Sequence, residues 1–299
     1  MVVVLAGGTG GAKLARGMLD VVGGDELTVV ANTGDDSLQY GVHVSPDPDL
    51  VAYWLADLID ERGWGIEGDT WHEMERRKAA GEEIWFNLGD RDLEWCRIRS
   101  ERLAAGKRLT EAHGAVVSGL GIAARVLPMC DEPVATFVRT GGAWRAFQEF
   151  MILERGAEPE DIELRGIEAA RPTPEVLEAI ERAEAIVIGP SNPVISIGPI
   201  LAVPGMRDAL AAARAPVVAV SPFVGGNVLK GPTEAFCRMA GLPLGTAAVE
   251  QAYAGVADGV VADEAAPSLP TRLTDVLMDT PEARRRVAEE ALGFAQTLK

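Results

Sequence analysis

The stretch VVVLAGGTGGAK, residues 2–13, decides the fold because it joins an apolar, β-branched run to a glycine-rich turn. The run Val2–Ala6 is predicted to be a strand buried on both faces of a sheet. Residues 12–21 continue with apolar side chains at helical spacing, and residues 27–31 form a second apolar run. A strand, turn, helix and strand within about thirty residues are typical of the mononucleotide-binding unit of doubly wound α/β folds.

The same alternation of helix and strand returns in the last part of the chain. The expected elements are a helix at 174–183, a strand at 185–188, a helix at 206–213, a strand at 216–220, and helices at 233–240 and 281–298. We therefore predict an α/β fold, with a Rossmann-like three-layer core and a mainly parallel sheet built from residues 1–49 and 166–299. Residues 50–165 are predicted to be a largely helical insertion with a small β element, where short alternating runs occur.

The composition limits the kind of partner. The chain has 299 residues, 47% of them hydrophobic, and a net charge of -17, which argues against nucleic acid because such a partner needs a basic field. Three scattered cysteines without a C-x-x-C spacing suit a reducing compartment, and no signal-peptide layout is found, so we expect a cytoplasmic protein. The uncharged stretch 185–206 contains four prolines, so we expect no membrane span.

The glycine-rich turn GGTGGAK, residues 7–13, is a candidate phosphate-binding site. Glycines let a ligand approach the backbone, and a helix N-terminus offers free N–H groups and a positive dipole end. The expected ligand contacts are Gly8, Thr9, Gly10, Gly11 and Lys13. The turn is not a Walker A loop, because Ala12 and Leu14 replace the required Gly and Ser/Thr. Lys13 also stands where a dinucleotide fingerprint has its third glycine, and an ordinary tight turn is the alternative.

Aspartates follow the second expected strand. Asp35 and Asp36 lie in the sequence NTGDD, and Asp47 and Asp49 come soon after in SPDPD. Because ligands bind at the carboxyl ends of parallel strands, these carboxylates could hold Mg²⁺ against a phosphate. An acidic protein that binds phosphates needs such local compensation of charge. The alternative is that the aspartates only form turns and helix N-caps.

Two further segments carry candidate ligand-binding side chains. Arg91 lies between two aspartates in LGDRDL, where it is either a planar donor for a ligand or part of an N-cap with a local salt bridge. Ser191, Asn192 and Ser196 lie in the loop after the strand expected at 185–188. Polar groups in that apolar setting need partners, which a ligand or the loop itself can supply. No Ser/His/Asp or Cys/His grouping stands out, so we do not expect covalent nucleophilic catalysis.

These segments resemble the 2-phospho-L-lactate transferase family of coenzyme F-420 biosynthesis, including its phosphoenolpyruvate transferase members. The matching stretches occur in order along most of the chain, at residues 7–13, 32–36, 45–49, 62–65, 69–71, 89–92, 147–150, 190–204 and 221–222. The resemblance implies that a deazaflavin, 7,8-didemethyl-8-hydroxy-5-deazariboflavin, attacks the phosphorus of a guanylylated phospho-acid. GMP then leaves in an in-line phosphoryl transfer, in which positioning and charge stabilisation supply most of the catalysis.

The resemblance also implies roles for particular residues. Asp49 and Arg91 would contact the deazaflavin, Asp36 and Asp49 would bind Mg²⁺, and Asp36, Asp49 and Arg91 are the candidate catalytic residues. The protein would be a homodimer, and its partners would be the two small-molecule substrates. The tryptophans of the insertion could stack on the deazaflavin or pack in a core. The sequence does not decide which loop holds guanine. It also does not decide whether phospholactate, phosphoenolpyruvate or phosphoglycerate is the transferred acid.

Two other functions compete with this one. A non-catalytic nucleotide- or nucleotide-sugar-binding regulator of the gluconeogenesis-factor type shares a glycine-rich start, but the GDRD element and residues 62–71 argue against it. A nicotinamide-dependent dehydrogenase is weakened by the missing third glycine and by Asn32, where an acidic residue would bind the ribose.

Overall fold

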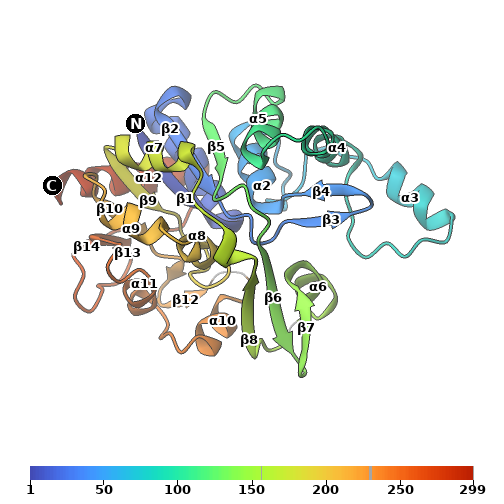
Figure 1. Ribbon diagram of the computed structural model, residues 1–299. Helices are drawn as coiled ribbons and strands as arrows, with labels where there is room; N and C mark the ends of the chain where they lie inside the picture. Colours follow the sequence, from blue (N-terminus) through green and yellow to red (C-terminus); the bar gives the residue numbers. More distant parts are fainter. Residues whose placement is uncertain (156, 229–230, 299) are drawn as a thin grey trace.

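A seven-stranded parallel sheet forms the centre of the computed structural model, which describes residues 1–155, 157–228 and 231–298 (Figure 1). In spatial order the strands are β14 (Thr271–Leu273), β13 (Gly259–Ala262), β10 (Val217–Val220), β9 (Ala185–Ile188), β1 (Val2–Ala6), β2 (Leu27–Ala31) and β5 (Arg125–Pro128). Every neighbouring pair in this sheet is parallel. The chain moves outward from β1 through β2 to β5, and then from β9 outward on the other side. The predicted α/β class with a mainly parallel sheet is confirmed.

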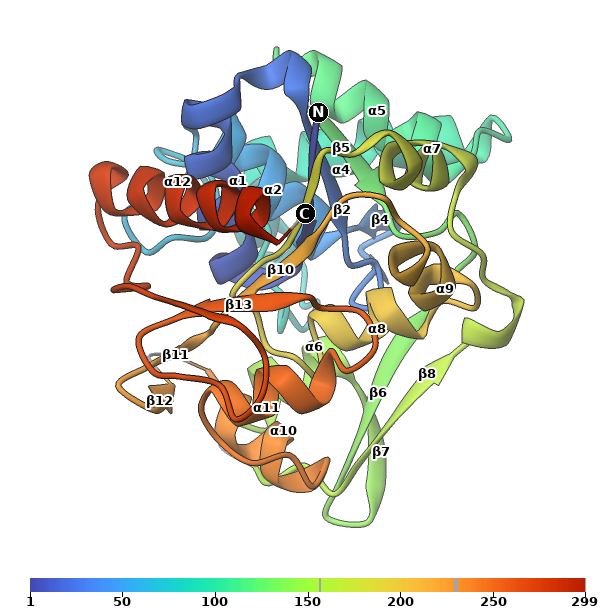
Figure 2. The same cartoon turned by 90° about the vertical axis from the view of Figure 1, so that its left-hand side faces the viewer.

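Helices cover both faces of the sheet, as Figure 2 shows. One layer consists of α1 (Gly8–Val22), α2 (Pro46–Leu55), α5 (Leu109–Gly119) and α12 (Pro281–Thr297). The other consists of α7 (Pro174–Arg182), α8 (Ile197–Ala202), α9 (Met206–Ala211) and α11 (Thr246–Ala252). Along β1, Val2 and Val4 are buried in the first layer, and Val3 and Leu5 in the second. Because both faces of the strand are covered, its sequence is continuously apolar.

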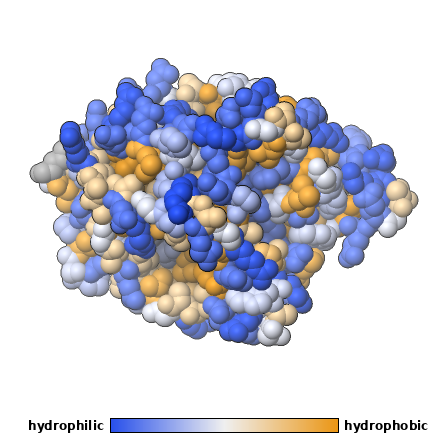
Figure 3. Space-filling view, in the orientation of Figure 1, coloured by the Kyte–Doolittle hydropathy of each residue, from blue (hydrophilic) through white to orange (hydrophobic). Residues whose placement is uncertain are grey.

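The helical part of the insertion extends away from the sheet on one side (Figure 1). It contains the helices α3 (His72–Ala79) and α4 (Asp90–Ala104), and it packs with the hairpin of β3 (Ser37–Gln39) and β4 (Val42–Val44), which precedes residue 50. Val42 and Val44 pack with Met74 and Leu93 in a separate small core. The arm that carries α3 is mostly hydrophilic on the face drawn in Figure 3. Strand β5 falls inside residues 50–165 but pairs with β2, so the insertion and the core share elements.

A three-stranded antiparallel sheet lies below the core in Figure 1. It comprises β6 (Ala135–Thr140), β7 (Ala143–Ala146) and β8 (Asp161–Arg165), with α6 (Phe147–Leu153) beside it. Phe147 and Phe150 of α6 contact Phe236 of α10 (Thr233–Met239), with ring centroids 6.4 and 5.8 Å apart, and so join this sheet to the core. It is the small β element that the sequence predicts.

The remaining described elements are short. They are η1 (Gly24–Glu26), η2 (Ile167–Ala169), β11 (Phe223–Val224) and β12 (Asn227–Val228). None of the helices in the described part of the chain is both long enough and apolar enough to cross a membrane.

Gly17 sets the distance between the neighbouring helices α1 and α12. A Cβ atom at this position would lie 2.4 Å from the carbonyl oxygen of Arg284, so Gly17→Ala must push the two helices apart. We expect it to lower the free energy of unfolding by about 1–3 kcal/mol, measured by chemical denaturation. Gly293→Ala on α12 is the matched control, because a Cβ there meets nothing within 4 Å. The control should gain up to about 1 kcal/mol, and a Gly17→Ala protein as stable as the wild type would refute this packing argument.

Candidate active site

The candidate site lies at the carboxyl edge of the sheet, between β1 and β9, where the strand order changes direction. Helix α1 begins at Gly8, so the glycines form its first turn and not a loop before it. A Cβ on Gly10 would lie 2.0 Å from the carbonyl oxygen of Pro190, so only glycine fits there. The amide of Gly11 donates to Ser191 Oγ at 2.9 Å. The structure thus brings the glycine turn and the loop after β9 together.

Asp47, in the first turn of α2, occupies part of the N-terminus of α1. Its Oδ1 accepts from the amide of Gly8 at 2.7 Å, and its Oδ2 accepts from Asn32 Nδ2 at 2.9 Å. Asp47 therefore supplies the negative charge that is favoured at a helix N-terminus. Among the described residues no side chain accepts from the amides of Thr9 and Gly10, so these two can bind an oxygen anion. Fewer amides of the glycine turn are therefore available to an anion than its sequence suggests.

The loop after β9 supplies Ser196 and Asn192. Ser196 Cβ lies 2.8 Å from the position that a Cβ on Gly7 would take, so this serine packs directly against the glycine turn. Asn192 Oδ1 accepts from two backbone N–H groups of its own loop, at 2.8 and 3.2 Å. The buried Nδ2 of Asn192 has no partner among the described residues. Asn192 therefore shapes the loop and keeps one donor free for a ligand.

Three aspartates, Asp35, Asp36 and Asp47, gather beyond the carboxyl end of β2. Burial and the charges of Asp47 and Asp36 raise the pKa of Asp35 well above its usual range, and its Oδ1 has no partner among the described residues. Burial also raises the pKa of Asp36, although Ser45 Oγ donates to its Oδ1 at 2.7 Å. Burial raises the pKa of Asp47 to about 6. Because no described Lys or Arg contacts these carboxylates, a bound cation would stabilise their ionised forms.

Asp49 has a different environment, because it forms a buried ion pair with Arg99 of α4. The guanidinium donates from Nη1 to Asp49 Oδ1 at 2.6 Å and from Nη2 to Oδ2 at 2.8 Å. The Nη2 group of Arg99 also donates to the carbonyl of His43 at 2.8 Å, and the amide of His43 donates to Ser100 Oγ at 2.7 Å. Helix α4 therefore holds the end of β4 and the start of α2 in place.

The sequence argument did not single out Arg99. One signal was present, because Arg99 follows Leu93 and Cys96 at spacings of three on the buried face of α4. An arginine in such an apolar stripe indicates a buried partner, but the sequence does not say which one.

Other polar groups around this ion pair are buried, and burial shifts their pKa values toward the uncharged forms. His113 is fully buried, with Nδ1 3.8 Å from Asp49 Oδ1, and neither ring nitrogen has a hydrogen-bond partner among the described residues. Burial lowers the pKa of His113 to about 4. Asp92 accepts from Tyr53 Oη at 2.8 Å, and burial raises the pKa of Asp92 to about 7. Asp49, Asp92 and Cys96 lie close enough to hold a metal, but both oxygens of Asp49 already accept from an arginine.

Arg91 and Lys13 point to other partners. Arg91 Nη1 donates to the carbonyl of Glu67 at 2.9 Å, and neither flanking aspartate pairs with it in the described chain. Asp90 instead accepts from the first two amides of α3, at 2.9 and 3.0 Å, so it acts as a cap for that helix. The local salt bridge considered from the sequence is therefore absent among the described residues. Lys13 Nζ lies 3.3 Å from Asp279 Oδ1, with which it forms an ion pair.

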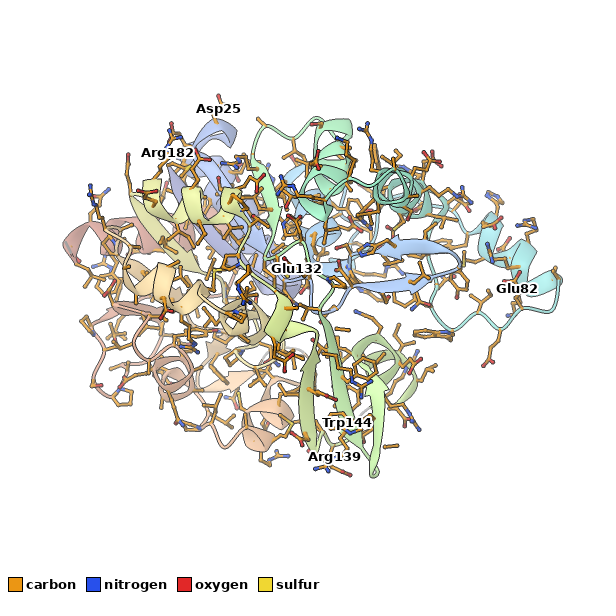
Figure 4. The ribbon with its side chains drawn as sticks, in the orientation of Figure 1. Asp25, Glu82, Glu132, Arg139, Trp144 and Arg182 are labelled. Atoms are coloured by element: carbon orange, nitrogen blue, oxygen red, sulfur yellow. The ribbon has the colours of Figure 1, made fainter. Side chains whose placement is uncertain are left out.

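A cavity of about 390 Å³ opens beside Asp36, near the carboxyl ends of β2 and β5. It is lined by Thr33, Asp36, Ser37, Leu38, His43, Leu103, Leu109, residues 131–135 and Arg165. Glu132, labelled near the centre of Figure 4, belongs to this lining. The volume lies within the range of small-molecule pockets, roughly 300–1,000 Å³. Residues 131–135 could not be assigned to a site from the sequence, because they reach it only through the pairing of β5 with β2.

The fold defines an α/β protein with a parallel sheet, and the candidate ligand site lies at the carboxyl edge of that sheet. The family of 2-phospho-L-lactate transferase CofD matches residues 2–289 of this chain. A 2-phospho-L-lactate transferase from Methanosarcina mazei is 42% identical over 265 residues, which cover 88% of this chain and 86% of that protein. A phosphoenolpyruvate transferase from Kitasatospora aureofaciens is 40% identical over 316 residues, which cover 100% of this chain and 98% of that protein.

The chain therefore belongs to the 2-phospho-L-lactate transferase family of coenzyme F-420 biosynthesis, and it is a transferase. This confirms the family that the sequence motifs indicated. A protein of the UPF0052 family from Bacillus halodurans has the same fold, with a TM-score of 0.62 at 17% identity, covering 97% of this chain and 98% of that one. That likeness concerns the fold alone.

The ion pair between Asp49 and Arg99 gives a stability prediction. Arg99→Met should lower the free energy of unfolding by roughly 3–5 kcal/mol, because it leaves the Asp49 carboxylate buried without a partner. Chemical denaturation at pH 7 measures the change. Arg285→Met is the matched control, since Arg285 makes an exposed pair with Glu289 at 2.8 Å, and it should change stability by less than about 0.5 kcal/mol. Equal effects of the two substitutions would contradict this account of Arg99.

Proposed function

We propose that the protein transfers a phospho-acid from its diphosphate conjugate with GMP to 7,8-didemethyl-8-hydroxy-5-deazariboflavin and releases GMP. The observation that carries the proposal is the family match over residues 2–289. The ribityl hydroxyl would attack the phosphorus that bears the acid, in line with the leaving GMP. Relatives named for 2-phospho-L-lactate and for phosphoenolpyruvate are 42% and 40% identical to this chain. The proposal therefore specifies that the transferred group is a phospho-acid, and an assay with different donors identifies which phospho-acid it is.

The geometry of the site supports this kind of reaction. The amides of Thr9 and Gly10, at the positive end of α1, are suited to oxygens of the diphosphate. Ser191 and Ser196 flank the same turn. Phosphoryl transfer is catalysed mainly by positioning and charge stabilisation, which agrees with a site whose described residues form no nucleophilic triad. Arg91 would contact the deazaflavin, as the resemblance implies, by exchanging its hydrogen bond to the Glu67 carbonyl.

Mg²⁺ is part of the proposal. Asp35 Oδ1 has no hydrogen-bond partner in the described part of the chain, and the pKa values of Asp35, Asp36 and Asp47 are raised. Both features fit a hard divalent cation that prefers carboxylate oxygens. Of the two ligands that the resemblance implies, Asp36 belongs to this cluster. Asp49 would have to exchange its two hydrogen bonds from Arg99 before it could bind a metal. When bound, Mg²⁺ would neutralise charge on the diphosphate oxygens.

One assay tests the proposed reaction. The protein is incubated with the deazaflavin, MgCl₂ and guanylylated phospholactate, phosphoenolpyruvate or phosphoglycerate in separate reactions, and the products are identified by mass spectrometry. We expect one mole of GMP for each mole of a deazaflavin that carries the phospho-acid. If the protein binds a nucleotide but forms no product from any donor, the proposed reaction is wrong and the non-catalytic regulator is favoured.

The proposal also includes a homodimer in the cytoplasm, which the family resemblance implies. Light scattering of the purified chain measures its mass in solution. A monomer at all concentrations used in the assay would remove the dimer from the proposal without affecting the reaction.

Asp36→Asn should lower kcat by roughly 100-fold or more, because it removes a charged oxygen ligand from the carboxylate cluster. The fold should persist, since the amide oxygen of asparagine can still accept from Ser45 Oγ. Steady-state kinetics and a melting temperature measure the two effects. Asp208→Asn, at an exposed position on α9, is the control and should leave both unchanged. Wild-type turnover by Asp36→Asn would remove Asp36 from the site.

Mg²⁺ should stabilise the protein in a manner that depends on pH. The raised pKa values mean that the folded state holds protons that the unfolded chain releases. Stability from these groups is therefore full below about pH 4 and falls as the pH rises through about 6, where Asp47 ionises. Melting curves with EDTA or MgCl₂ should show a large Mg²⁺ shift at pH 8 and a small one at pH 5. Equal shifts at both values would argue against metal binding by these carboxylates.

A further inference from the structure

The loop between α2 and α3 holds a tryptophan out in solvent. Trp64 is 62% exposed, compared with 37% for Trp71 and 36% for Trp144. The loop around it is nonetheless well connected, with a bridge between Ile59 and Ile66 and a hydrogen bond of 3.1 Å from the amide of Asp60 to the carbonyl of Gly65. An exposed indole on an ordered loop leaves a large apolar face in water, which a ligand could cover.

This loop runs alongside the candidate active site. A Cβ on Gly63, next to Trp64, would lie 3.7 Å from Thr9 Cγ2, at the tip of the glycine turn. Three residues beyond Trp64, the carbonyl of Glu67 accepts from Arg91 Nη1 at 2.9 Å. Trp64 therefore lies on the segment that connects the glycine turn with Arg91, which are two of the places where the sequence predicts ligand contacts.

A fixed cation lies over the ring of Trp64. The guanidinium carbon of Arg62 is 5.1 Å from the ring centroid, and Arg62 Nε donates to Asp60 Oδ2 at 2.6 Å. Asp60 thus holds the arginine in place, and the arginine stacks on the indole. Because a cation packs on one face of the indole, the ring is already ordered, and its other face can stack on a planar ligand.

We propose that Trp64 provides a stacking face for a planar heteroaromatic ring of a substrate, either the guanine of the donor or the deazaflavin of the acceptor. The inference rests on the proposed function, because that reaction brings two such rings to this site. Stacking of a heteroaromatic ring on an exposed tryptophan that needs no rearrangement contributes equally before and during the reaction. It therefore acts on substrate binding more than on the rate of the bound complex.

The experiment measures binding of free GMP and of the deazaflavin by isothermal titration calorimetry, without turnover. Trp64→Ala should raise the dissociation constant of one of these ligands by about tenfold or more. Trp64→Phe should restore most of the affinity, and both variants should keep the wild-type melting temperature because the ring is exposed. In steady state, Trp64→Ala should raise KM for the same substrate and leave kcat nearly unchanged.

Trp144→Ala is the matched control. Trp144 also has an arginine over its ring, with Arg139 at 5.8 Å, but both residues lie at the far end of the small antiparallel sheet (Figure 4). The ligand whose affinity falls in Trp64→Ala, and not in Trp144→Ala, identifies the ring that stacks. If Trp64→Ala binds both ligands with wild-type affinity, the inference about Trp64 is wrong, but the proposed function is unaffected. A wild-type protein that binds neither ligand would overturn the proposed function and this inference with it.

Discussion

The candidate site depends on the buried ion pair between Asp49 and Arg99. Both groups are out of water, and the pair is tolerated because two guanidinium–carboxylate hydrogen bonds and the carbonyl of His43 satisfy their polar atoms. Asp49 belongs to α2 and Arg99 to α4, so the helical insertion cannot move from the core without separating buried charges. The segment between these contacts carries Ser45 and Asp47. The placement of the site carboxylates therefore follows from a contact that lies outside the sheet.

This pair also divides the aspartates into two kinds. Asp49 forms an ion pair with Arg99, whereas no described Lys or Arg forms an ion pair with Asp35, Asp36 or Asp47, although the charge of Arg99 acts to lower the pKa of Asp36. A phosphate ligand would bring further negative charge to this cluster, in a chain whose net charge is already -17. The amides at the N-terminus of α1 supply only partial positive charge, and one of them already binds Asp47. A cation between a diphosphate and the ionised cluster, as proposed above, would offset the repulsion between them.

Most of the fold could be predicted from the sequence, because it depends on local patterns. The runs Val2–Ala6, Leu27–Ala31 and Ala185–Ile188 are apolar throughout, as strands covered on both faces must be. The glycine turn and the loop after β9 were found for the same reason, since each follows such a strand. Strand β5 was not assigned to the core, because it has only four residues and starts with an exposed arginine.

The parts of the site that sequence reasoning missed depend on long-range contacts. Arg99 and Asp49 are 50 positions apart, and no local pattern pairs them. Arg91 is the opposite case, because two adjacent aspartates made a local salt bridge one of the two interpretations left open by the sequence. Neighbouring side chains on a helix point in different directions, so Asp90 caps α3 and Asp92 accepts from Tyr53. Sequence adjacency is thus a poor guide to ion pairs at a helix start, whereas helical spacing predicts which side chains are buried.

The histidines beside the carboxylates show what kind of catalysis this arrangement suits. Burial and the charge of Arg99 lower the pKa of His43 to about 4, and burial does the same for His113, so both are neutral at pH 7. They neither offset the charge of the aspartates nor offer a ready proton. The site also offers backbone amides, side-chain amides, hydroxyls and carboxylates, several of them fixed by hydrogen bonds between segments distant in sequence. Such a site can orient two substrates and stabilise charge, and those are the contributions that phosphoryl transfer requires.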